Sequence, residues 1–503
     1  MAIIRAILGL WLSLMMSAIV YAKPLEVKSQ NFILYGNIGE GSAKTLLTEL
    51  EDYRAAILQR MGASNLGPEI IPVRIYIADG PKEIEKLTGA VGAGGVYRTS
   101  LEGPVFVLNS RSGFRRGNKA RAIALHEYTH HLLASFTTTT YPRWYSEGLA
   151  EYLSTFKTNK KGHIIIGQPE QDHAYALKNI KWFPVERMLS SVRRYPYPND
   201  NSRNTQIAKS IFYAQSWLAV HYIQSTPGYP AKFAAYLDLL NQANTPENAF
   251  ESAFGETPSE FGEKLKTYHK RNRYLTVTIA LPETRSQTEI SVRVMSKSEL
   301  AFHMAESIRH FEAHESGFEK ALDYYAKASE DPALAARINA SKAQFLGALG
   351  KYNEAVPLIE TALAGNPKDT DLNRAAGMLW LFQNKNAESF DQNTVVKARK
   401  ALVRAMQLNP DNVPAHFYYA TSFIDSSSKP SKQAVASAQT SLDYYRSVNF
   451  VEKNMALAHV LIKADKADEA VPALQKAIAW SNSPSRRRYA KSQLERVQHT
   501  EKN

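Results

Sequence analysis

The sequence predicts an α+β domain, with a small sheet followed by a helical half, and behind it an all-α solenoid of repeated helices. Two observations support this fold class. Short β-type runs alternate with helical stretches over residues 31–109, and the pattern from residue 118 to about residue 272 is nearly all helical. Pairs of alanines seven residues apart then recur along the rest of the chain. With 503 residues, 44% of them hydrophobic, the chain has room for several domains with real cores.

The first 22 residues are typical of an export signal. Arg5 gives a positive start, residues 6–20 form an apolar run, and Ala22 offers a small residue for cleavage. We expect a signal peptide over residues 1–22, cleaved after Ala22, and a periplasmic or secreted bacterial protein. The alternative is an uncleaved membrane anchor, although the run is short for a spanning helix. No later segment approaches the ~20 consecutive apolar residues of a bilayer crossing, so no stable membrane span is expected after cleavage.

Composition excludes several kinds of chemistry. The chain has no cysteine, which rules out disulfides, thiol catalysis, cysteine-bound metals and a lipidated N-terminal cysteine. Its formal net charge is +13, with local basic clusters at residues 111–121 and 486–488. Because most basic residues are spread along the chain, we interpret them as a solvated surface and expect no nucleic-acid partner.

Four short runs in the first domain have the β-branched and aromatic composition of strands, at residues 31–35, 73–77, 95–97 and 105–108. An amphipathic helix is expected between the first two runs, at about residues 43–61. We assign residues 23–272 to this domain. Residues 273–296 include two further β-type runs, at 274–279 and 290–294, and are expected to form a connector.

Residues 297–503 carry the alanine pairs. They are Ala321 with Ala328, Ala355 with Ala362, Ala398 with Ala405 and Ala470 with Ala477, with Ala434 and Ser441 as a weaker copy. The pairs recur every 34 to 43 residues, and Pro332, Pro367 and Pro410 follow the first three. Small residues where two helices cross, followed by a helix-ending proline, resemble tetratricopeptide repeats, whose period is ~34 residues. The alternative is an unrelated helical bundle. A repeat stack offers a concave surface for a protein partner or peptide.

The chemistry of the chain is concentrated at residues 126–130. His126 and His130 lie four residues apart on an expected helix, so both can reach one zinc ion from the same face. Glu127 lies beside the first histidine, where its carboxylate can take a proton from the attacking water and pass it to a leaving amine. His131 points about 100° away from His130 and is not expected to bind metal.

A second motif follows at residues 144–152, which read Trp-Tyr-Ser-Glu-Gly-Leu-Ala-Glu-Tyr. Together with His-Glu-Tyr-Thr-His at 126–130, it resembles the peptidase MA-like gluzincin family of zinc metallopeptidases, over residues 31 to about 272. The resemblance implies one zinc per chain, with Glu147 as the third ligand. It also implies that Glu151 accepts a hydrogen bond from the first histidine. The alternative, two glutamates on a solvated helix face, leaves the aromatic and Gly-Leu-Ala surroundings unexplained.

Two further matches extend this resemblance. Residues 104–110 precede the zinc helix, as does the strand along which gluzincins pair an extended substrate, and we expect them at an edge of the sheet. Tyr213 is expected to open a helix, and a similarly placed tyrosine in gluzincin aminopeptidases hydrogen-bonds the oxyanion. The resemblance implies that role for Tyr213. The alternative is an ordinary buried tyrosine at a helix start.

The function expected from these residues is zinc-assisted hydrolysis of peptide bonds, with the repeats recruiting a substrate or partner. Aminopeptidases of this group anchor the free amine with a glutamate in a Gly-x-Met-Glu-Asn stretch. Residues 101–109 lack this stretch, and only Glu102 could substitute. We therefore expect an endopeptidase, or an enzyme without strong preference for chain ends. The alternatives are a repeat-based adaptor with a vestigial zinc site and a zinc hydrolase acting on a cell-wall amide.

Overall fold

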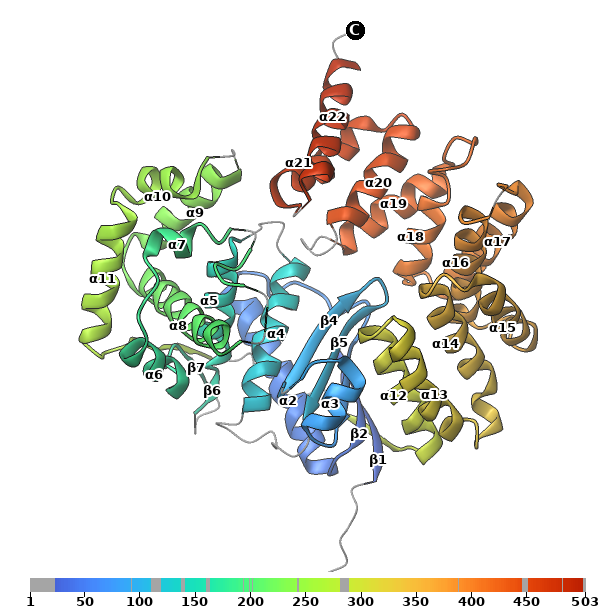
Figure 1. Ribbon diagram of the computed structural model, residues 1–503, viewed down its shortest axis with the longest axis horizontal. Helices are drawn as coiled ribbons and strands as arrows, with labels where there is room; N and C mark the ends of the chain where they lie inside the picture. Colours follow the sequence, from blue (N-terminus) through green and yellow to red (C-terminus); the bar gives the residue numbers. More distant parts are fainter. Residues whose placement is uncertain are drawn as a thin grey trace, which may run out of the picture.

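A computed structural model describes the chain from residue 23 to residue 500, apart from residues 92, 110–118, 137–140, 160–162, 193, 199, 201, 242–243, 281–288, 388, 446–450 and 482. The expected signal peptide, residues 1–22, and most of the basic cluster at 111–121 lie outside the described residues. Figure 1 shows a central sheet with a helical half on one side. On the other side, the helices from α12 (Lys297–Phe311) to α22 (Pro484–Thr500) follow one another in an arc.

The central sheet has the strand order β4-β5-β3-β2-β1-β9. Its strands are β1 (Pro24–Lys28), β2 (Phe32–Asn37), β3 (Val73–Ala78), β4 (Gly95–Ser100), β5 (Gly103–Asn109) and β9 (Ser291–Val294). β3 is parallel to both β2 and β5, whereas β4, β1 and β9 pair antiparallel with their neighbours. The four runs expected as strands in the first domain are confirmed, and β1 was not predicted.

The edge of this sheet differs from the expectation. The run at 104–110 corresponds to β5, which lies between β4 and β3 and is buried along its whole length. The prediction that this run forms the edge is wrong. The reason is the tight hairpin before it, which folds β4 back onto β5 from Ser100 opposite Gly103 to Gly95 opposite Leu108. β4 is therefore the strand that ends the sheet on this side.

Both faces of the sheet are covered by helices, because successive side chains of a strand point to opposite faces. Ile75 and Phe106 face a core shared with α2 (Glu40–Arg60) and the helical half. Tyr76 and Val107 face a second core, built with α3 (Pro81–Thr88), α12 and α13 (Glu315–Ala328). The first helical pair after the connector thus belongs to the same folded body as the sheet.

The helical half surrounds α8 (Arg203–Ser225), which packs against α5 (Arg143–Ser154) and α6 (Gln171–Asn179). α4 (Lys119–Phe136) lies between α5 and the sheet. The remaining elements are α7 (Val185–Leu189), α9 (Tyr229–Asn241), α10 (Pro246–Phe254), α11 (Pro258–Lys270) and a small sheet of β6 (Lys157–Thr158), β7 (Ile164–Ile166) and β8 (Val277–Ile279).

The expected connector is tied to both sheets. Its first β-type run contains β8, which pairs with β7 in the helical half. Its second run contains β9, which pairs with β1 at the end of the central sheet opposite β4. The described parts of residues 273–296 are therefore held at both ends.

The C-terminal region is a stack of helical hairpins. The helices are α12 to α22, with α14 (Ala335–Ala348), α15 (Tyr352–Gly365), α16 (Thr370–Lys385), α17 (Gln392–Leu408), α18 (Val413–Thr421), α19 (Lys432–Tyr444), α20 (Val451–Lys463) and α21 (Ala467–Trp480) between the elements already given. Each small-residue pair lies on the second helix of a hairpin and is almost fully buried. Ala355, for example, has no exposed surface, and Ala362 has 2%. The small side chains let paired helices approach closely, as the repeat interpretation predicted.

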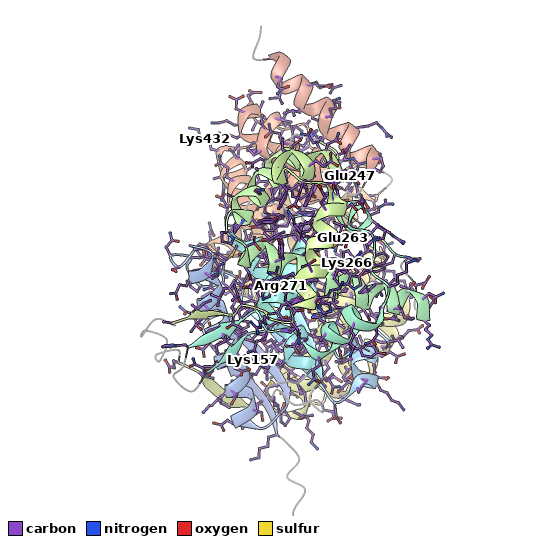
Figure 2. All side chains as sticks on the ribbon, turned by 90° about the vertical axis from the view of Figure 1, so that its left-hand side faces the viewer. Lys157, Glu247, Glu263, Lys266, Arg271 and Lys432 are labelled. Atoms are coloured by element: carbon purple, nitrogen blue, oxygen red, sulfur yellow. The ribbon has the colours of Figure 1, made fainter. Side chains whose placement is uncertain are left out.

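Charged side chains of both signs are interspersed over the surface. Figure 2 shows Glu247, Glu263, Lys266 and Arg271 on the helical half, and Lys266 forms an ion pair with Glu263. Such neighbours offset one another, which fits the interpretation of the basic residues as a solvated surface. Among the described residues, no helix has the length and apolar character needed to cross a membrane.

Candidate metal centre

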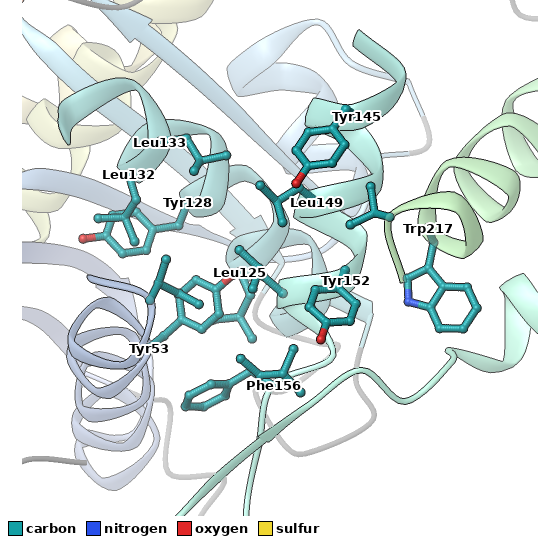
Figure 3. Packing of buried hydrophobic residues seen from close by; sticks show 14 of the residues in the cluster. Tyr53, Leu125, Tyr128, Leu132, Leu133, Tyr145, Leu149, Tyr152, Phe156 and Trp217 are labelled. Atoms are coloured by element: carbon teal, nitrogen blue, oxygen red, sulfur yellow. The ribbon is translucent and has the colours of Figure 1, made fainter. Parts of the chain in front are cut away.

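The motif helix α4 is anchored by its apolar face. Leu125, Tyr128 and Leu132 recur at helical spacing and are almost fully buried between α2 and α5. Figure 3 shows these side chains with Tyr53 of α2 and Leu149 of α5 around them. His126, Glu127 and His130 take the intervening positions and are half-buried. The same periodicity that buries the leucines therefore turns the motif residues toward the interior of the helical half.

The second motif helix, α5, crosses α8 at very short range. A Cβ atom on Gly148 would lie 2.3 Å from the backbone oxygen of Ser216 and 2.8 Å from the side chain of Val220. Only glycine permits this approach. The Gly-Leu-Ala part of the motif thus has a packing role, since it lets α8 approach the helix that carries Glu147.

Three ligand-type atoms converge between α4 and α5. The Nε2 atoms of His126 and His130 lie 3.3 Å apart, and each lies 3.2 Å from Oε2 of Glu147. Among the described residues, these three form the group whose geometry could hold a metal ion. The structure thus brings together the three residues predicted as ligands.

The remaining polar atoms of these three side chains point away from the centre and are engaged. Nδ1 of His126 lies 3.1 Å from Glu151, and Nδ1 of His130 lies 3.1 Å from the hydroxyl of Ser146. The hydroxyl of Tyr195 donates a 2.7 Å hydrogen bond to Oε1 of Glu147. Partners of this kind fix the orientation of each ligand and leave its other nitrogen or oxygen free for a metal.

The spacing fits zinc. Histidine nitrogens and carboxylate oxygens bind zinc tetrahedrally at about 2.0–2.1 Å, which places neighbouring ligand atoms roughly 3.3 Å apart. The observed separations of 3.2 to 3.3 Å match this value. Two histidines and one carboxylate also leave a fourth position open, as in catalytic zinc sites. The donor set and its spacing therefore fit a zinc ion.

The charges of the cluster hold it together. Burial alone would lower the pKa of His126, but the charge of Glu151 and hydrogen bonds to Glu147 and Glu151 raise that pKa well above its ordinary value. Burial alone would raise the pKa of Glu147, yet the charge of His130 and hydrogen bonds from both histidines hold it well below its usual range. In the metal-free protein, His126 and Glu147 therefore stabilise each other in charged form.

Glu151 lies where the resemblance placed it, and it has a second partner. Its other oxygen lies 3.4 Å from Nε2 of His173, on α6, which sequence reasoning missed. Burial alone would raise the pKa of Glu151, but His126 and then His173 lower it. The two histidines thus keep Glu151 ionised, as required of a hydrogen-bond acceptor for a metal ligand.

Tyr213 reaches the metal centre from the middle of α8 rather than from a helix start. Its ring centroid lies 6.0 Å from that of His126, and its hydroxyl lies 3.4 Å from that of Tyr195. Burial, and after it the charge of Glu147, raises the pKa of Tyr213 well above its ordinary value. The Tyr213 hydroxyl therefore keeps its proton and can donate a hydrogen bond beside the centre.

Two neighbours of this centre were missed by sequence reasoning. Tyr195 comes from the irregular segment before α8, and burial, followed by the charge of Glu147, raises its pKa to about 12. Arg143, at the start of α5, lies over the Tyr195 ring and donates a 3.2 Å hydrogen bond to its hydroxyl. Arg143 also lies one helical turn before Glu147, at 3.5 Å from Oε1, and that spacing was the one available clue.

Glu127, beside the first histidine ligand on α4, is half-buried. Its charge contributes to the raised pKa of His126 and, after burial, to that of Tyr97 on β4. Among the described residues, none forms a hydrogen bond or ion pair with its carboxylate. Tyr97 itself lies 3.3 Å from Nδ1 of His131, the histidine that was not expected to bind metal. The charge of Glu127 thus acts on both the metal cluster and the edge strand β4.

Comparisons with known proteins concern the repeats. No protein-family model matches the chain, and no curated protein matches it. Three solved structures are similar to part of it. The first, a thermophilic TPR protein from Thermus thermophilus, has 18% identity and a TM-score of 0.30, covering 39% of this chain and 99% of its own. The second, YrrB, a TPR protein with an unusual peptide-binding site, has 18% identity and a TM-score of 0.28, covering 39% and 92%. The third, MamA MSR-1 C2, has 15% identity and a TM-score of 0.26, covering 40% and 95%.

The first two of these neighbours are described as TPR proteins. The tetratricopeptide-like character of this chain rests on its own residues. Paired helices with buried alanines, repeated from α12 to α21, are the features of that repeat class.

Proposed function

We propose that the chain is a zinc-dependent hydrolase that cleaves peptide bonds. One observation carries the proposal: three ligand atoms, on His126, His130 and Glu147, converge at 3.2 to 3.3 Å. Two imidazole nitrogens and one carboxylate oxygen at this spacing form a donor set that a zinc ion can bridge. Glu127 beside them adds the general base that hydrolysis needs.

The chemistry would be divided among a few side chains. Bound zinc would polarise the scissile carbonyl and lower the pKa of the attacking water toward ~7. Glu127 takes the proton of that water and delivers it to the leaving amine. Tyr213 donates a hydrogen bond to the carbonyl oxygen as negative charge develops there. Tyr195, through its 2.7 Å hydrogen bond, keeps Glu147 in its orientation during the reaction.

The substrate would pair with β4. This strand ends the sheet, packs beside α4 and carries Tyr97 near Glu127. An extended peptide can add to such an edge and be held by its backbone. Glu102, the only candidate anchor for a free amine, is instead engaged by two arginines of the repeats. This arrangement supports cleavage within a chain rather than at its N-terminus.

Two other functions compete with this proposal. In the first, the repeats act as an adaptor that binds peptides or proteins, and the zinc site is a relic. The presence of Glu127 beside a complete ligand set favours the enzyme, since a relic has no need for a base. In the second, the same zinc chemistry acts on a cell-wall amide. In each case we propose an exported protein, on the basis of the apolar run at residues 6–20.

One experiment separates the three functions. The purified protein is incubated with casein, and separately with peptidoglycan fragments, with and without 1,10-phenanthroline. We expect casein fragments that disappear with the chelator and return when zinc is added. Release of amide-linked fragments from peptidoglycan alone would favour the cell-wall hydrolase, and no cleavage of either substrate with zinc bound would favour the adaptor.

A further inference from the structure

The tip of the β4–β5 hairpin is held by the repeats. Glu102, at this tip, accepts two hydrogen bonds from the guanidinium of Arg309, at 3.1 and 2.7 Å. Arg374 of α16 lies 3.4 Å from the same carboxylate, and Glu306 of α12 forms a 2.8 Å ion pair with Arg309. We call Glu102, Glu306, Arg309 and Arg374 the latch cluster. It joins the sheet to the first and third repeat hairpins, α12–α13 and α16–α17.

The latch cluster is electrically matched. Burial alone would raise the pKa of Glu102, but Arg309 and then Arg374 hold it well below its usual range. Burial, followed by Arg74, lowers the pKa of the adjacent His310, so this ring stays neutral and can accept the 2.9 Å hydrogen bond from Arg74. A bidentate, buried arginine–carboxylate pair of this kind is directional as well as strong.

The repeats contact the sheet in two ways. α12 packs along the sheet in a shared core, whereas α16 reaches the tip of the β4–β5 hairpin through Arg374. Beside the latch cluster, a cavity of about 410 Å³ lies between the repeats and β3, with Arg74 on the sheet side and Ser341 on the repeat side.

A second anchor binds the same tip from the far end of the arc. The hydroxyl of Tyr445, just after α19, donates a 2.7 Å hydrogen bond to the backbone oxygen of Leu101. The Leu101 side chain packs against the apolar cluster of α18 to α22, which includes Phe417 and Leu457. Asn454 in turn donates a 2.9 Å hydrogen bond to the backbone oxygen of Tyr445. Two separate parts of the repeat stack therefore hold two neighbouring residues.

The same apolar cluster also contacts the opposite wall of the metal centre. Val192 packs against it. The backbone oxygen of Val192 accepts a 3.1 Å hydrogen bond from the backbone nitrogen of Arg143, the first residue of the helix that carries Glu147. Three residues further along, Tyr195 binds Glu147 itself. The C-terminal repeats thus contact both the strand wall and the wall that supplies Glu147.

We propose that the repeat stack is an intramolecular clamp across the two segments that flank the metal cluster, with the β4–β5 hairpin as its built-in ligand. Glu102, Arg309, Arg374 and Tyr445 are positioning residues: they touch no reacting atom but fix the distance between β4 and the Val192–Tyr195 wall. The clamp itself is independent of the proposed hydrolysis, and only its effect on turnover rests on that function.

The test uses the full-length, metal-free protein and hydrogen–deuterium exchange. In Glu102→Ala we expect exchange to rise roughly tenfold or more in β4 and β5, because breaking a buried ion pair leaves its partners uncompensated. We also expect faster exchange in peptides that contain Arg143 or Tyr195, which Glu102 does not touch. Glu256→Ala, which removes a buried carboxylate paired with Lys264 in the helical half, is the matched control and should leave β4 and β5 unchanged.

If Glu102→Ala does not fold, Tyr445→Phe serves as the second test variant. Its control is Tyr419→Phe, because the Tyr419 hydroxyl hydrogen-bonds within the repeats, to Ser431. Loss of protection on both walls supports the clamp. Loss confined to the hairpin and the repeats, or no change at all, overturns it. If the protein is active, Glu102→Ala should have a lower kcat/KM than the parent on a short peptide, with unchanged zinc affinity. Glu102→Asp, which keeps the carboxylate, should recover the parent's kcat/KM. If the exchange result holds and no activity is found, the proposed hydrolysis fails while the clamp stands.

Discussion

Two clusters of buried charge lie on either side of the β4–β5 hairpin, and they are assembled in opposite ways. In the latch cluster, each carboxylate faces a guanidinium, as in the 2.7 Å contact between Glu102 and Arg309. In the metal cluster, formed by His126, His130 and Glu147, three ligand-type atoms converge at 3.2 to 3.3 Å. The first cluster pairs carboxylates with guanidinium groups, and the second gathers the nitrogen and oxygen donors that zinc binds.

This difference distinguishes charged residues that hold the fold together from charged residues that are arranged to bind a ligand. Buried ion pairs that satisfy each other hold elements in register and need nothing else. Imidazole and carboxylate groups that converge, while their remaining polar atoms are held by other residues, have the orientation expected of metal ligands. Both clusters contain residues with strongly shifted pKa values. A shifted pKa alone therefore does not identify the site, whereas the direction in which the polar atoms point does.

The largest expected effect comes from removing one of the converging atoms. His126→Ala leaves two protein ligands, too few to hold zinc in a tetrahedral site, so bound zinc and hydrolysis should both be lost. Metal content is measured by atomic emission after gel filtration, with one zinc per chain expected in the parent protein. His459→Ala, a histidine of the repeats, should keep its zinc. Retention of one zinc by His126→Ala would remove this residue from the ligand set.

The next effect distinguishes residues that bind zinc from the residue that acts as the base in hydrolysis. Glu127→Gln should bind zinc as the parent does, because Glu127 is not among the converging groups. Its amide cannot transfer a proton, so peptide hydrolysis should fall by about 10²- to 10⁴-fold. Steady-state rates on a fluorogenic peptide are compared at equal zinc content. Parent-like rates would show that another group acts as the base.

Lowering the pH tests the contribution of the latch cluster to stability. Although burial opposes it, Arg309 lowers the pKa of Glu306 to about 2. Glu306 therefore stabilises the fold above about pH 4.3, its unfolded value, and this contribution is lost as the pH falls toward 2. Burial, followed by Arg337, lowers the pKa of His303 to about 3. Stability therefore also declines once the unfolded histidine binds protons, below about pH 6.5.

We expect the free energy of unfolding of the metal-free protein to be lower at pH 3 than at pH 7 by on the order of 2 kcal/mol or more. Urea titrations at several pH values measure it. Glu306→Gln should be less stable at pH 7 and should show a flatter profile below pH 4.5, since it has lost the group that titrates there. Identical profiles for the two proteins would mean that Glu306 does not contribute.

The smallest effect concerns an orienting partner of the metal cluster. Tyr195→Phe removes the hydroxyl that binds Oε1 of Glu147. Loss of such a partner typically weakens zinc binding by about 10- to 100-fold without abolishing it. Competition with a zinc-binding dye gives the affinity, and Tyr236→Phe, at a buried tyrosine of α9, serves as the control. Equal affinities in the two variants would show that Tyr195 does not orient the ligand.

The parts of this structure that could be predicted from sequence are those with a local period. The strands at 73–77 and 105–108 were visible as short apolar runs, and the alanine pairs marked the buried face of each second helix. His126, Glu127 and His130 were visible because a helix brings residues four apart onto one face. Glu147 and Glu151 came from a motif on a single helix. In each case, the pattern that supports the prediction lies within a single helix or strand.

What escaped prediction came from segments without such a period. Tyr195 lies in an irregular stretch, and His173 lies on a short helix whose sequence gives no reason to direct it at Glu151. The edge strand was misassigned because the apolar composition of residues 104–110 is compatible with an edge strand and with an interior strand. Only the pairing of β4 decides between the two.

The sequence by itself determined the identity and the helical spacing of the candidate zinc ligands, the order of the two regions and the register of small residues in the repeats. Each of these depends on backbone periodicity, which acts over a few residues. The tertiary structure alone decided that His126, His130 and Glu147 converge and that Tyr195 and Ser146 orient them. It also decided that Glu102 reaches Arg309, 207 positions later in the chain. Such contacts depend on how two faces pack, and packing is set by the sum of all side chains in a core rather than by any local pattern.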